Sequence, residues 1–346
     1  MNQSIQTSVD WRKSLTLNNR KTMLVISVFF LIYFSIGMLV DLYIYSGQYP
    51  QVPWPQLFTA LISFKLFPLV TLVMLSIAAI SLLVTFAFHD KLMLLGTEYH
   101  EITPTTAQSN QEKQLYNIIE ELKIAAGLQF MPKVYIIDAN YMNAFASGYS
   151  EKSAMVAITR GLIEKLNRNE LQAVMAHELS HIRHMDIKLT LMASVLANLM
   201  IMVLDMFFYS AIFGSSRSSE DNRSRNALAT IIIIVRYVLP VINILLLLYL
   251  SRTREYMADA GSVELLRDNQ GLASALLKIN DDHAENQASY SAAYQQTPHE
   301  NVRREAYIYD PLQAGIEPMS SLADIFSTHP NLKDRLAAIG YVLKNE

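Results

Sequence analysis

Four long apolar runs constrain this 346-residue chain more than any other feature of its sequence. Each run extends over at least 18 residues and holds at most one charged residue. A helix of about 20 apolar residues crosses the ~30 Å hydrocarbon layer of a membrane. We therefore expect a multi-pass membrane protein with four transmembrane helices. The runs are residues 23–40, 66–88, 189–213 and 227–250.

The composition agrees with a membrane location. Hydrophobic residues make up 51% of the chain and charged residues 17%, whereas about a quarter of an average soluble chain is charged. The net charge of −3 gives no electrostatic basis for binding nucleic acid. The absence of cysteine excludes disulfides, cysteine nucleophiles and thiolate metal sites.

Basic residues set the expected orientation of the first two runs. They cluster before the first run, and the link SGQYPQVPWPQ that follows it has no lysine or arginine. Because basic flanks stay in the cytosol, we place the N-terminus inside and this link outside. A cleaved signal peptide is the alternative, but the run is too long and no small-residue cleavage site follows it. The basic residues are Arg12, Lys13, Arg20 and Lys21.

The second pair of runs is less regular than the first. Its link, GSSRSSEDNRSR, would place three arginines outside, so a re-entrant helical pair is the alternative to two spans. In an antiparallel hairpin Asp205 and Arg236 would lie at nearly the same depth, within ~2 Å at 1.5 Å per residue. We expect them to form an ion pair, because an unpaired charge inside a span costs about 2.5–3.5 kcal/mol. In the alternative arrangement Arg236 snorkels and Asp205 faces a water-filled cleft.

This topology divides the chain into alternating cytosolic and membrane parts. Both termini then lie in the cytosol, and no internal repeat is visible. The expected parts are a cytosolic N-terminal segment (1–22), transmembrane helices 1 and 2 (23–88), a first cytosolic part (89–188), a transmembrane or re-entrant hairpin (189–250) and a second cytosolic part (251–346).

The cytosolic parts combine helices with short strands. NQEKQLYNIIEELKIAAGL predicts an amphipathic helix that stops at Gly127, and NELQAVMAHELSHIRHMD predicts a helix with Asn169 as its N-cap. KVYIID and SAMVAIT predict strands, and NAFASG between them predicts a turn or strand edge. Beyond residue 250 we expect helices broken by a polar stretch at residues 281–318. The expected fold class is mainly α with a small β-sheet (α+β).

The predicted helix NELQAVMAHELSHIRHMD carries a pattern typical of zinc hydrolases. His177 and His181 are four residues apart, so they share one helical face and lie ~6 Å apart along the axis. In such H-E-x-x-H sites both histidines bind zinc and the glutamate, here Glu178, is the general base. The alternative is a pair of structural histidines. His184 lies ~10.5 Å along the helix from His177, so we do not expect it to bind the same ion.

A catalytic zinc site needs a third protein ligand. In SRTREYMADAGS, Glu255 and Asp259 lie about one helical turn apart. Glu255 can reach the metal while Asp259 accepts a hydrogen bond from a ligand imidazole. Spacing alone leaves a second interpretation open, namely a solvated acidic helix face.

Several separated motifs resemble those of the M48 metallopeptidases. In chain order they are NAFASG, TRGLIEKLNRNELQAVMAHELSHI, SRTREYMADAGS and FSTHPNLKDRL, and they are most similar to those of HtpX-like heat-shock membrane proteases, over roughly residues 20–270 and 319–340. The resemblance implies a gluzincin-type metalloprotease domain with one Zn²⁺ per chain, Glu255 as third ligand and Asp259 as partner of a ligand histidine. Asn331 stands where the family has a second proline, Ser147 replaces a threonine, and residues 281–318 match no motif.

The resemblance also implies peptide-bond hydrolysis by a zinc metalloendopeptidase. SAMVAIT would pair with an extended peptide by strand addition, and NAFASG would shape that edge. His329 is a candidate for oxyanion stabilisation or for a reversible fourth ligand; alternatively it caps a helix, since Pro330 suits a first helical turn. Arg335 supports either role or forms a structural ion pair. The predicted substrate edge comprises Asn143, Ala144, Phe145, Met155, Val156 and Ala157.

These features together predict a protease of the bacterial cytoplasmic (inner) membrane that clears damaged or misfolded membrane proteins under stress. Its partners would be membrane-protein or unfolded polypeptide substrates and the lipid bilayer. Because His177 and His181 precede the third run and Glu255 follows the fourth, the metal would lie on the cytosolic side, close to the membrane. The alternatives are a maturation protease for a defined substrate, as in the prenylated-peptide branch with its additional spans, and a non-catalytic chaperone or scaffold.

Overall fold

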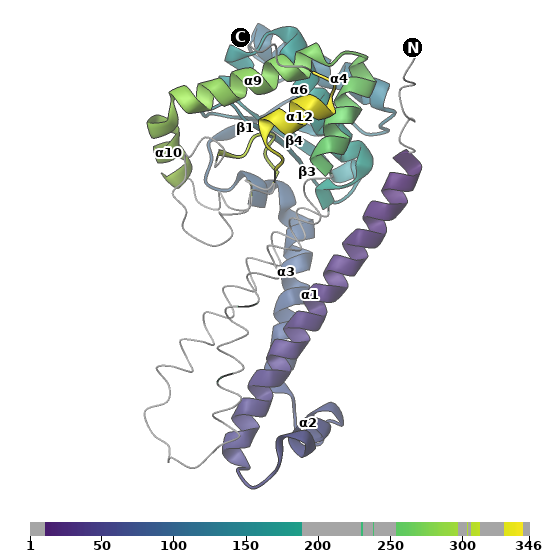
Figure 1. Cartoon of the computed structure of the whole chain (residues 1–346), viewed down its shortest axis with the longest axis vertical. Coiled ribbons are helices and arrows are strands. Elements are labelled where there is room, and N and C mark those ends of the chain that lie inside the picture. Colours follow the sequence, from purple (N-terminus) through teal and green to yellow (C-terminus); the bar gives the residue numbers. More distant parts are fainter. Residues whose placement is uncertain are drawn as a thin grey trace. The chain divides into compact units, whose positions relative to one another are not determined.

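The computed structural model describes residues 11–188, 230, 238, 254–296, 303, 306–311 and 329–341. These residues are mainly helical, with one four-stranded mixed sheet (Figure 1). This composition of elements agrees with the expected α+β class. The chain divides into two units, one that includes residues 23–87 and one that includes the described residues from 88 to 188 and from 254 to 341.

The first two apolar runs are confirmed as long apolar helices. Within α1 (Trp11–Gln48) and α3 (Leu69–Leu94), the segments Met23–Gln48 and Leu69–Leu94 have the length and composition of membrane spans, with mean hydropathies of 2.6 and 2.5. The link between them holds a short helix, α2 (Trp54–Ile62). Apart from residues 230 and 238, the third and fourth runs, with Asp205 and Arg236, lie outside the described residues.

An acidic side chain of α1 holds the start of α3. Asp41 is 2% exposed, and its carboxylate accepts hydrogen bonds from the backbone N–H groups of Val70 and Thr71, at 3.0 and 2.8 Å, and from the Thr71 hydroxyl at 2.7 Å. The first N–H groups of a helix have no partner inside that helix, so Asp41 caps α3. One turn earlier, a Cβ added at Gly37 would lie 2.5 Å from the Cα of Thr71. The two helices therefore meet backbone to backbone at this point.

The second unit is built on a four-stranded sheet with the order β1-β2-β4-β3. β2 and β4 are parallel, and the outer pairs β1–β2 and β3–β4 are antiparallel. The strands expected from KVYIID and SAMVAIT are confirmed as β2 and β4, whereas β1 was not anticipated. The strands are β1 (Tyr99–Ile102), β2 (Lys133–Ile137), β3 (Ala144–Ser147) and β4 (Met155–Thr159).

The position of β4 inside the sheet corrects one expectation about substrate binding. Met155, Val156 and Ala157 pair with β2 on one side and with β3 on the other. Their backbone groups are thus used within the sheet, and the prediction that this strand pairs with a substrate was wrong. Every residue of β4 is buried, which is the continuous apolar pattern of a central strand. The edge belongs to β3.

Helices surround the sheet in this unit. α4 (Asn110–Ala126) ends at Gly127, as predicted, and this glycine adopts the left-handed conformation with φ of 72°. α6 (Arg168–His184) packs against α4, against α9 (Gln270–Glu285) and against β3 (Figure 1). α6 therefore lies in the core of the unit. The other described helices are α5 (Arg160–Lys165), α10 (Gln287–Gln296) and α12 (Leu332–Ala338), with a 3-10 turn at Glu151–Ser153.

The start of α6 differs from the sequence expectation by two residues. The N-cap is Asn167, not Asn169: its side chain accepts from the N–H groups of Asn169 and Glu170, at 3.0 and 3.1 Å. The Glu170 carboxylate in turn accepts from the N–H of Asn167 at 2.9 Å, which completes a capping box. In the sequence, the Asn-x-x-Glu spacing was the pattern that indicates this capping box.

Candidate metal centre

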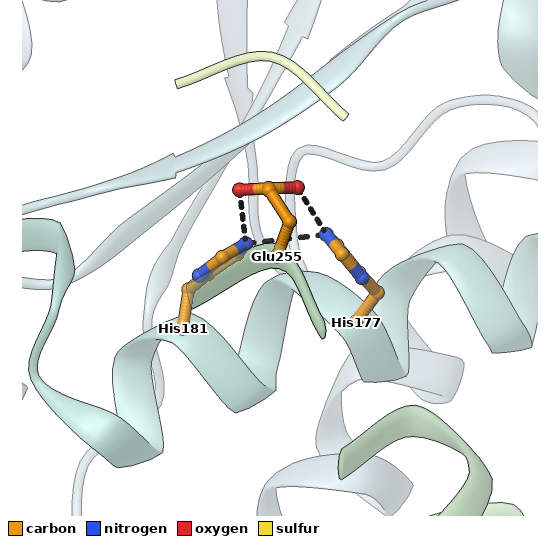
Figure 2. A group of neighbouring side chains, drawn as sticks. All are labelled: His177, His181 and Glu255. Carbon is orange, nitrogen blue, oxygen red and sulfur yellow. Dashed lines mark hydrogen bonds and ion pairs between the residues drawn. The ribbon is translucent and has the colours of Figure 1, made fainter. Parts of the chain in front are cut away.

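His177, His181 and Glu255 converge from two helices (Figure 2). The histidines project from α6, and Glu255 projects from a helix that includes residues 254–266. The two histidine Nε2 atoms are 3.1 Å apart, and each lies 3.6 Å from one oxygen of Glu255. The structure thus brings together three residues that the sequence analysis had selected from distant segments.

The donor set fits a metal ion. The Nδ1 atom of His177 faces Asp259 and that of His181 faces Asp186. Carboxylates only accept hydrogen bonds, so both Nδ1 atoms carry a hydrogen, and in the neutral rings both Nε2 lone pairs point into the same small space. Two lone pairs at 3.1 Å repel unless a cation lies between them. Ligands placed ~2.0–2.1 Å from a tetrahedral zinc are about 3.4 Å apart, which matches the observed spacings of 3.1 and 3.6 Å.

The electrostatic field of the cluster also favours a cation. Burial by itself lowers the pKa of His177, but the Asp259 and Glu255 carboxylates outweigh burial and raise this pKa to about 9. Burial raises the pKa of Glu255, yet the charges of His329, His177 and His181 hold it well below its usual range. Glu255 is therefore an anionic ligand candidate.

Close helix packing sets the position of Glu255 relative to α6. A Cβ added at Gly261 would lie 2.5 Å from the Oγ of Ser180. The hydroxyl of Ser262 donates to the carbonyl of Ala173 at 2.8 Å. These contacts lock the helix that carries Glu255 against α6, so only a small residue is accommodated at position 261.

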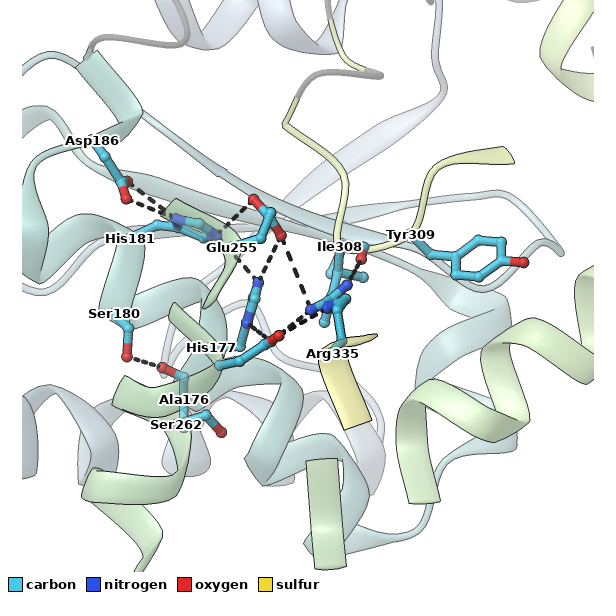
Figure 3. A network of polar contacts seen from close by, with 12 residues as sticks. Ala176, His177, Ser180, His181, Asp186, Glu255, Ser262, Ile308, Tyr309 and Arg335 are labelled. Carbon is cyan, nitrogen blue, oxygen red and sulfur yellow. Dashed lines mark hydrogen bonds and ion pairs between the residues drawn. The ribbon is translucent and has the colours of Figure 1, made fainter. Parts of the chain in front are cut away.

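Asp259 and Arg335 form a buried pair next to His177; His177 and Arg335 are labelled in Figure 3. Asp259 Oδ1 lies 2.9 Å from His177 Nδ1, and Arg335 donates to both Asp259 oxygens, from Nε at 2.9 Å and from Nη2 at 2.7 Å. Burial raises the pKa of Asp259, but the Arg335 guanidinium and His177 bring it below its usual range. A charged Asp259 fixes the ring orientation and tautomer of His177. The position of Asp259 agrees with the role that the family resemblance implies.

Asp186 is a residue of the site that the sequence analysis did not select. Both of its carboxylate oxygens lie 3.1 Å from the Nδ1 of His181, and it is 1% exposed. The chain reaches this position because Met185, the C-cap of α6, adopts the left-handed conformation with φ of 56°. The residue lies in the quoted helix sequence, HELSHIRHMD, five positions after His181. Residues five positions apart do not share a helix face, so the spacing did not predict contact between Asp186 and His181.

Glu178 is fully buried next to the two histidines. Within the described part of the chain neither of its carboxylate oxygens has a hydrogen-bond partner. Burial raises the pKa of Glu178 to about 6, against the opposing effect of His177 and His181. Burial of a carboxylate without a hydrogen bond destabilises the folded state. Such a destabilising group is typical of a catalytic residue.

Comparison with known proteins decides the family, since residues 109–342 match Peptidase family M48. The chain belongs to peptidase family M48. It is 37% identical over 331 residues to the Protease HtpX homolog of Helicobacter acinonychis (strain Sheeba), covering 96% of this chain and 98% of that protein. It is 30% identical over 336 residues to the Protease HtpX homolog of Streptococcus uberis (strain ATCC BAA-854 / 0140J), covering 95% and 99%. The crystal structure of S. mikatae Ste24p aligns with a TM-score of 0.46 and 17% identity, covering 94% of this chain and 67% of that chain.

The predicted resemblance to M48 metallopeptidases and their HtpX-like members is thereby confirmed. The chain is an M48 metallopeptidase, and His177, His181 and Glu255 form a cluster that can hold its metal. Together with its apolar helices, the likeness to HtpX homologues indicates a membrane protease.

Two further histidines of this M48 chain were assigned from the sequence. His184 is buried but does not belong to the metal-binding group of described residues. His329 is 2% exposed, and its charge contributes to the lowered pKa of Glu255. The N-cap of α12 is Asn331, whose side chain accepts from the N–H of Asp334 at 2.8 Å. The interpretation of His329 as the capping residue was therefore wrong, and Asn331 performs that task where the family has proline.

Proposed function

We propose that this chain is a zinc-dependent endopeptidase of the cytoplasmic membrane, with its active site facing the cytosol and damaged or misfolded membrane proteins as substrates. The observation that carries the proposal is the buried Glu178 carboxylate beside the metal cluster, with no hydrogen-bond partner among the described residues. His177, His181 and Glu255 would hold one Zn²⁺. When bound, zinc lowers the pKa of water and polarises the scissile carbonyl.

The chain's own residues supply the proton transfers and the orientation. Glu178 takes a proton from the attacking water and returns it to the leaving amine. Asp259 and Asp186 keep the Nδ1 hydrogens of His177 and His181 in place, so each Nε2 presents a lone pair. His329, buried near Glu255, donates a hydrogen bond to the carbonyl oxygen as negative charge develops there.

The edge strand of the sheet supports an extended substrate. Among the named strands β3 pairs with β4 alone, so we place the substrate backbone on its other side by strand addition, where Tyr307 now bridges Phe145. Asn143 lies at the start of this strand and is fully buried. Main-chain pairing places few demands on sequence, which suits a protease for unfolded chains. Of the substrate edge predicted from the sequence, Asn143, Ala144 and Phe145 remain in the proposal.

The membrane orientation is proposed from the flanks of the spans. Basic residues precede the first run and are absent from the link after it. His181 precedes the second pair of runs in the sequence and Glu255 follows it. Both can bind one ion only if the chain between them returns to the same side of the membrane.

Metal content and proteolysis, measured together, test this function. The purified full-length protein is assayed for bound zinc and for casein cleavage, beside Glu178→Gln. Retained zinc with at least a 100-fold loss of cleavage is expected for removal of a general base. His177→Ala, His181→Ala and Glu255→Ala should each lose zinc, whereas His184→Ala should keep it. Cleavage by neither wild type nor variant would favour a non-catalytic chaperone, and unchanged zinc in Glu255→Ala would reject the third ligand.

A further inference from the structure

Residues 307–309 lie against the outer side of β3, with a β-bridge at Tyr307 and bends at Ile308 and Tyr309. Tyr307 forms an antiparallel bridge with Phe145, and the N–H of Ile308 donates to the carbonyl of Ala144 at 2.9 Å. The rings of Tyr307 and Phe145 meet edge to face, with centroids 5.7 Å apart. All three residues of the segment are nearly inaccessible to solvent. The chain thus covers its own sheet edge at Ala144 and Phe145.

Side chains of the site hold the backbone of this segment. The amide nitrogen of Asn143 donates to the carbonyl of Tyr309 at 3.0 Å, and the N–H of Tyr309 donates back to the Asn143 Oδ1 at 3.4 Å. Arg335 donates from Nη1 to the carbonyl of Ile308 at 2.5 Å (Figure 3). The same guanidinium binds Asp259 and lies 4.0 Å from Glu255. The segment therefore contacts groups that stand directly beside the metal cluster.

These contacts are those of a bound peptide. Four consecutive backbone groups, the N–H and C=O of Ile308 and of Tyr309, are each bonded to the strand edge or to Asn143 and Arg335. One of these bonds, from Ile308 to Ala144, is the backbone-to-backbone bond that strand addition uses, and the other three involve the side chains of Asn143 and Arg335. A substrate strand that pairs with Ala144 and Phe145 in the same direction would need the same donors and acceptors. Both peptides cannot use them at once.

We propose that residues 307–309 are a built-in ligand of the substrate edge, and that a polypeptide substrate binds only after this segment withdraws. The proposal rests on the endopeptidase function proposed above. Among the described residues, the segment meets β3 through one bridge. Occupation of the edge lowers the apparent affinity for substrate by the fraction of molecules in which the edge is open.

A reversible lock tests this proposal directly. Phe145 and Tyr307 are opposed across an antiparallel pair, where Cα separations of about 4.5–5.5 Å fall within the range of a disulfide. The chain has no cysteine, so Phe145→Cys with Tyr307→Cys adds one defined bond. Casein cleavage is measured on the same protein before and after oxidation and after reduction. The matched control is Glu101→Cys with Tyr135→Cys, an opposed pair at the far side of the sheet.

Oxidation of the Phe145→Cys, Tyr307→Cys variant should lower the rate of casein cleavage at least 20-fold, and reduction should restore the rate. The cleavage rate of the control pair should not change on oxidation. Cleavage that continues at the reduced rate in the oxidised form would overturn the proposal, because the segment would then be a fixed wall of the site. Binding of fluorescein-labelled casein, measured in a Glu178→Gln background, gives the same comparison without hydrolysis. A failure of proteolysis in the wild type therefore leaves the test of the segment intact.

A second variant covers the case in which the cysteine pair disturbs the edge itself. Ile308→Pro removes the N–H that donates to Ala144. Loss of one backbone hydrogen bond should lower KM, or the Kd for labelled casein, by about 2- to 10-fold with little change in kcat. Tyr309→Phe is the control, because it keeps the backbone and loses only the hydroxyl that donates to Asn280 at 3.0 Å. An unchanged or raised Kd in Ile308→Pro would refute the competition.

Discussion

Replacing Asp186 by asparagine tests the carboxylate that holds His181. The two Asp186 oxygens each lie 3.1 Å from the His181 Nδ1, and the residue is 1% exposed. Asparagine keeps the shape but removes the charge that favours a cation at His181. Loss of such an outer partner typically weakens metal binding about 10- to 100-fold, which corresponds to about 1.4–2.8 kcal/mol. We expect Asp186→Asn to lower Zn²⁺ affinity by this factor, with Asp259→Asn showing a comparable loss through His177.

The affinity is measured by competition between the detergent-solubilised protein and a chromophoric zinc chelator. Glu264→Gln is the matched control, because Glu264 pairs with Arg183 of the same helix at 3.5 Å but its side chain is 53% exposed. Surface pairs of this kind contribute about 0–1 kcal/mol, so the control should bind zinc as the wild type does. Thermal unfolding in the presence of EDTA separates orientation of the ligand from damage to the fold. Wild-type affinity in Asp186→Asn, beside loss of zinc in His181→Ala, would refute the orienting role.

Three further predictions concern other parts of the molecule. Single cysteines at Ser150 and Ser289 should resist a membrane-impermeant thiol reagent in intact cells and react after lysis; labelling of only one of them in intact cells would contradict the common sidedness of the two soluble parts. Asp41→Ala should destabilise the packing of α1 on α3 by about 1–2 kcal/mol through loss of a helix cap, seen as faster proteolysis in detergent, whereas Asp41→Asn should lose less because one acceptor oxygen remains. Burial lowers the pKa of His283 to about 4, below the ~6.5 of an unfolded chain. Its contribution to the free energy of unfolding is therefore present above pH 6.5 and falls by up to about 3 kcal/mol as the pH drops towards 4. His283→Gln should flatten this part of the plot of stability against pH, and an unchanged plot would mean that another group causes the loss of stability in acid.

The chemistry of the site could be predicted from the sequence because it depends on local spacing. The interval between His177 and His181 equals about one helical turn, and so does the interval between Glu255 and Asp259, so each pair shares a helix face in any fold that keeps the helix. What brought the two helices together was not visible in either segment. That contact depends on the small Gly261 against Ser180 and on the bond from Ser262 to Ala173.

The contribution of Asp186 could not be predicted for a different physical reason. It lies beyond the end of α6, where periodicity no longer applies, and it returns to His181 only through the left-handed Met185. Methionine rarely adopts this conformation, so the residue type at position 185 did not predict the turn. By contrast, Gly127 indicated the end of α4, and that prediction was confirmed.

The order of the sheet was the main error in the fold. Three strand-like segments follow one another closely in the chain, and alternation cannot say which of them is central. β4 pairs in parallel with β2 although β3 separates them in the sequence, so the last of the three strands in the chain lies between the other two. β3 and β4 are both buried throughout, so burial does not distinguish the edge strand from the central one.

Arg335 shows how metal ligation and peptide binding depend on one another in this site. Two of its nitrogens hold Asp259, which orients His177, and the third holds the carbonyl of Ile308 on the sheet edge. The guanidinium is planar and rigid, so the Asp259 pair fixes where the third nitrogen points. If residues 307–309 withdraw as proposed, that nitrogen stays in place and meets the carbonyl of the arriving chain. Under this proposal, the ion pair that orients the candidate ligand His177 also holds a hydrogen-bond donor in position for the carbonyl of the substrate.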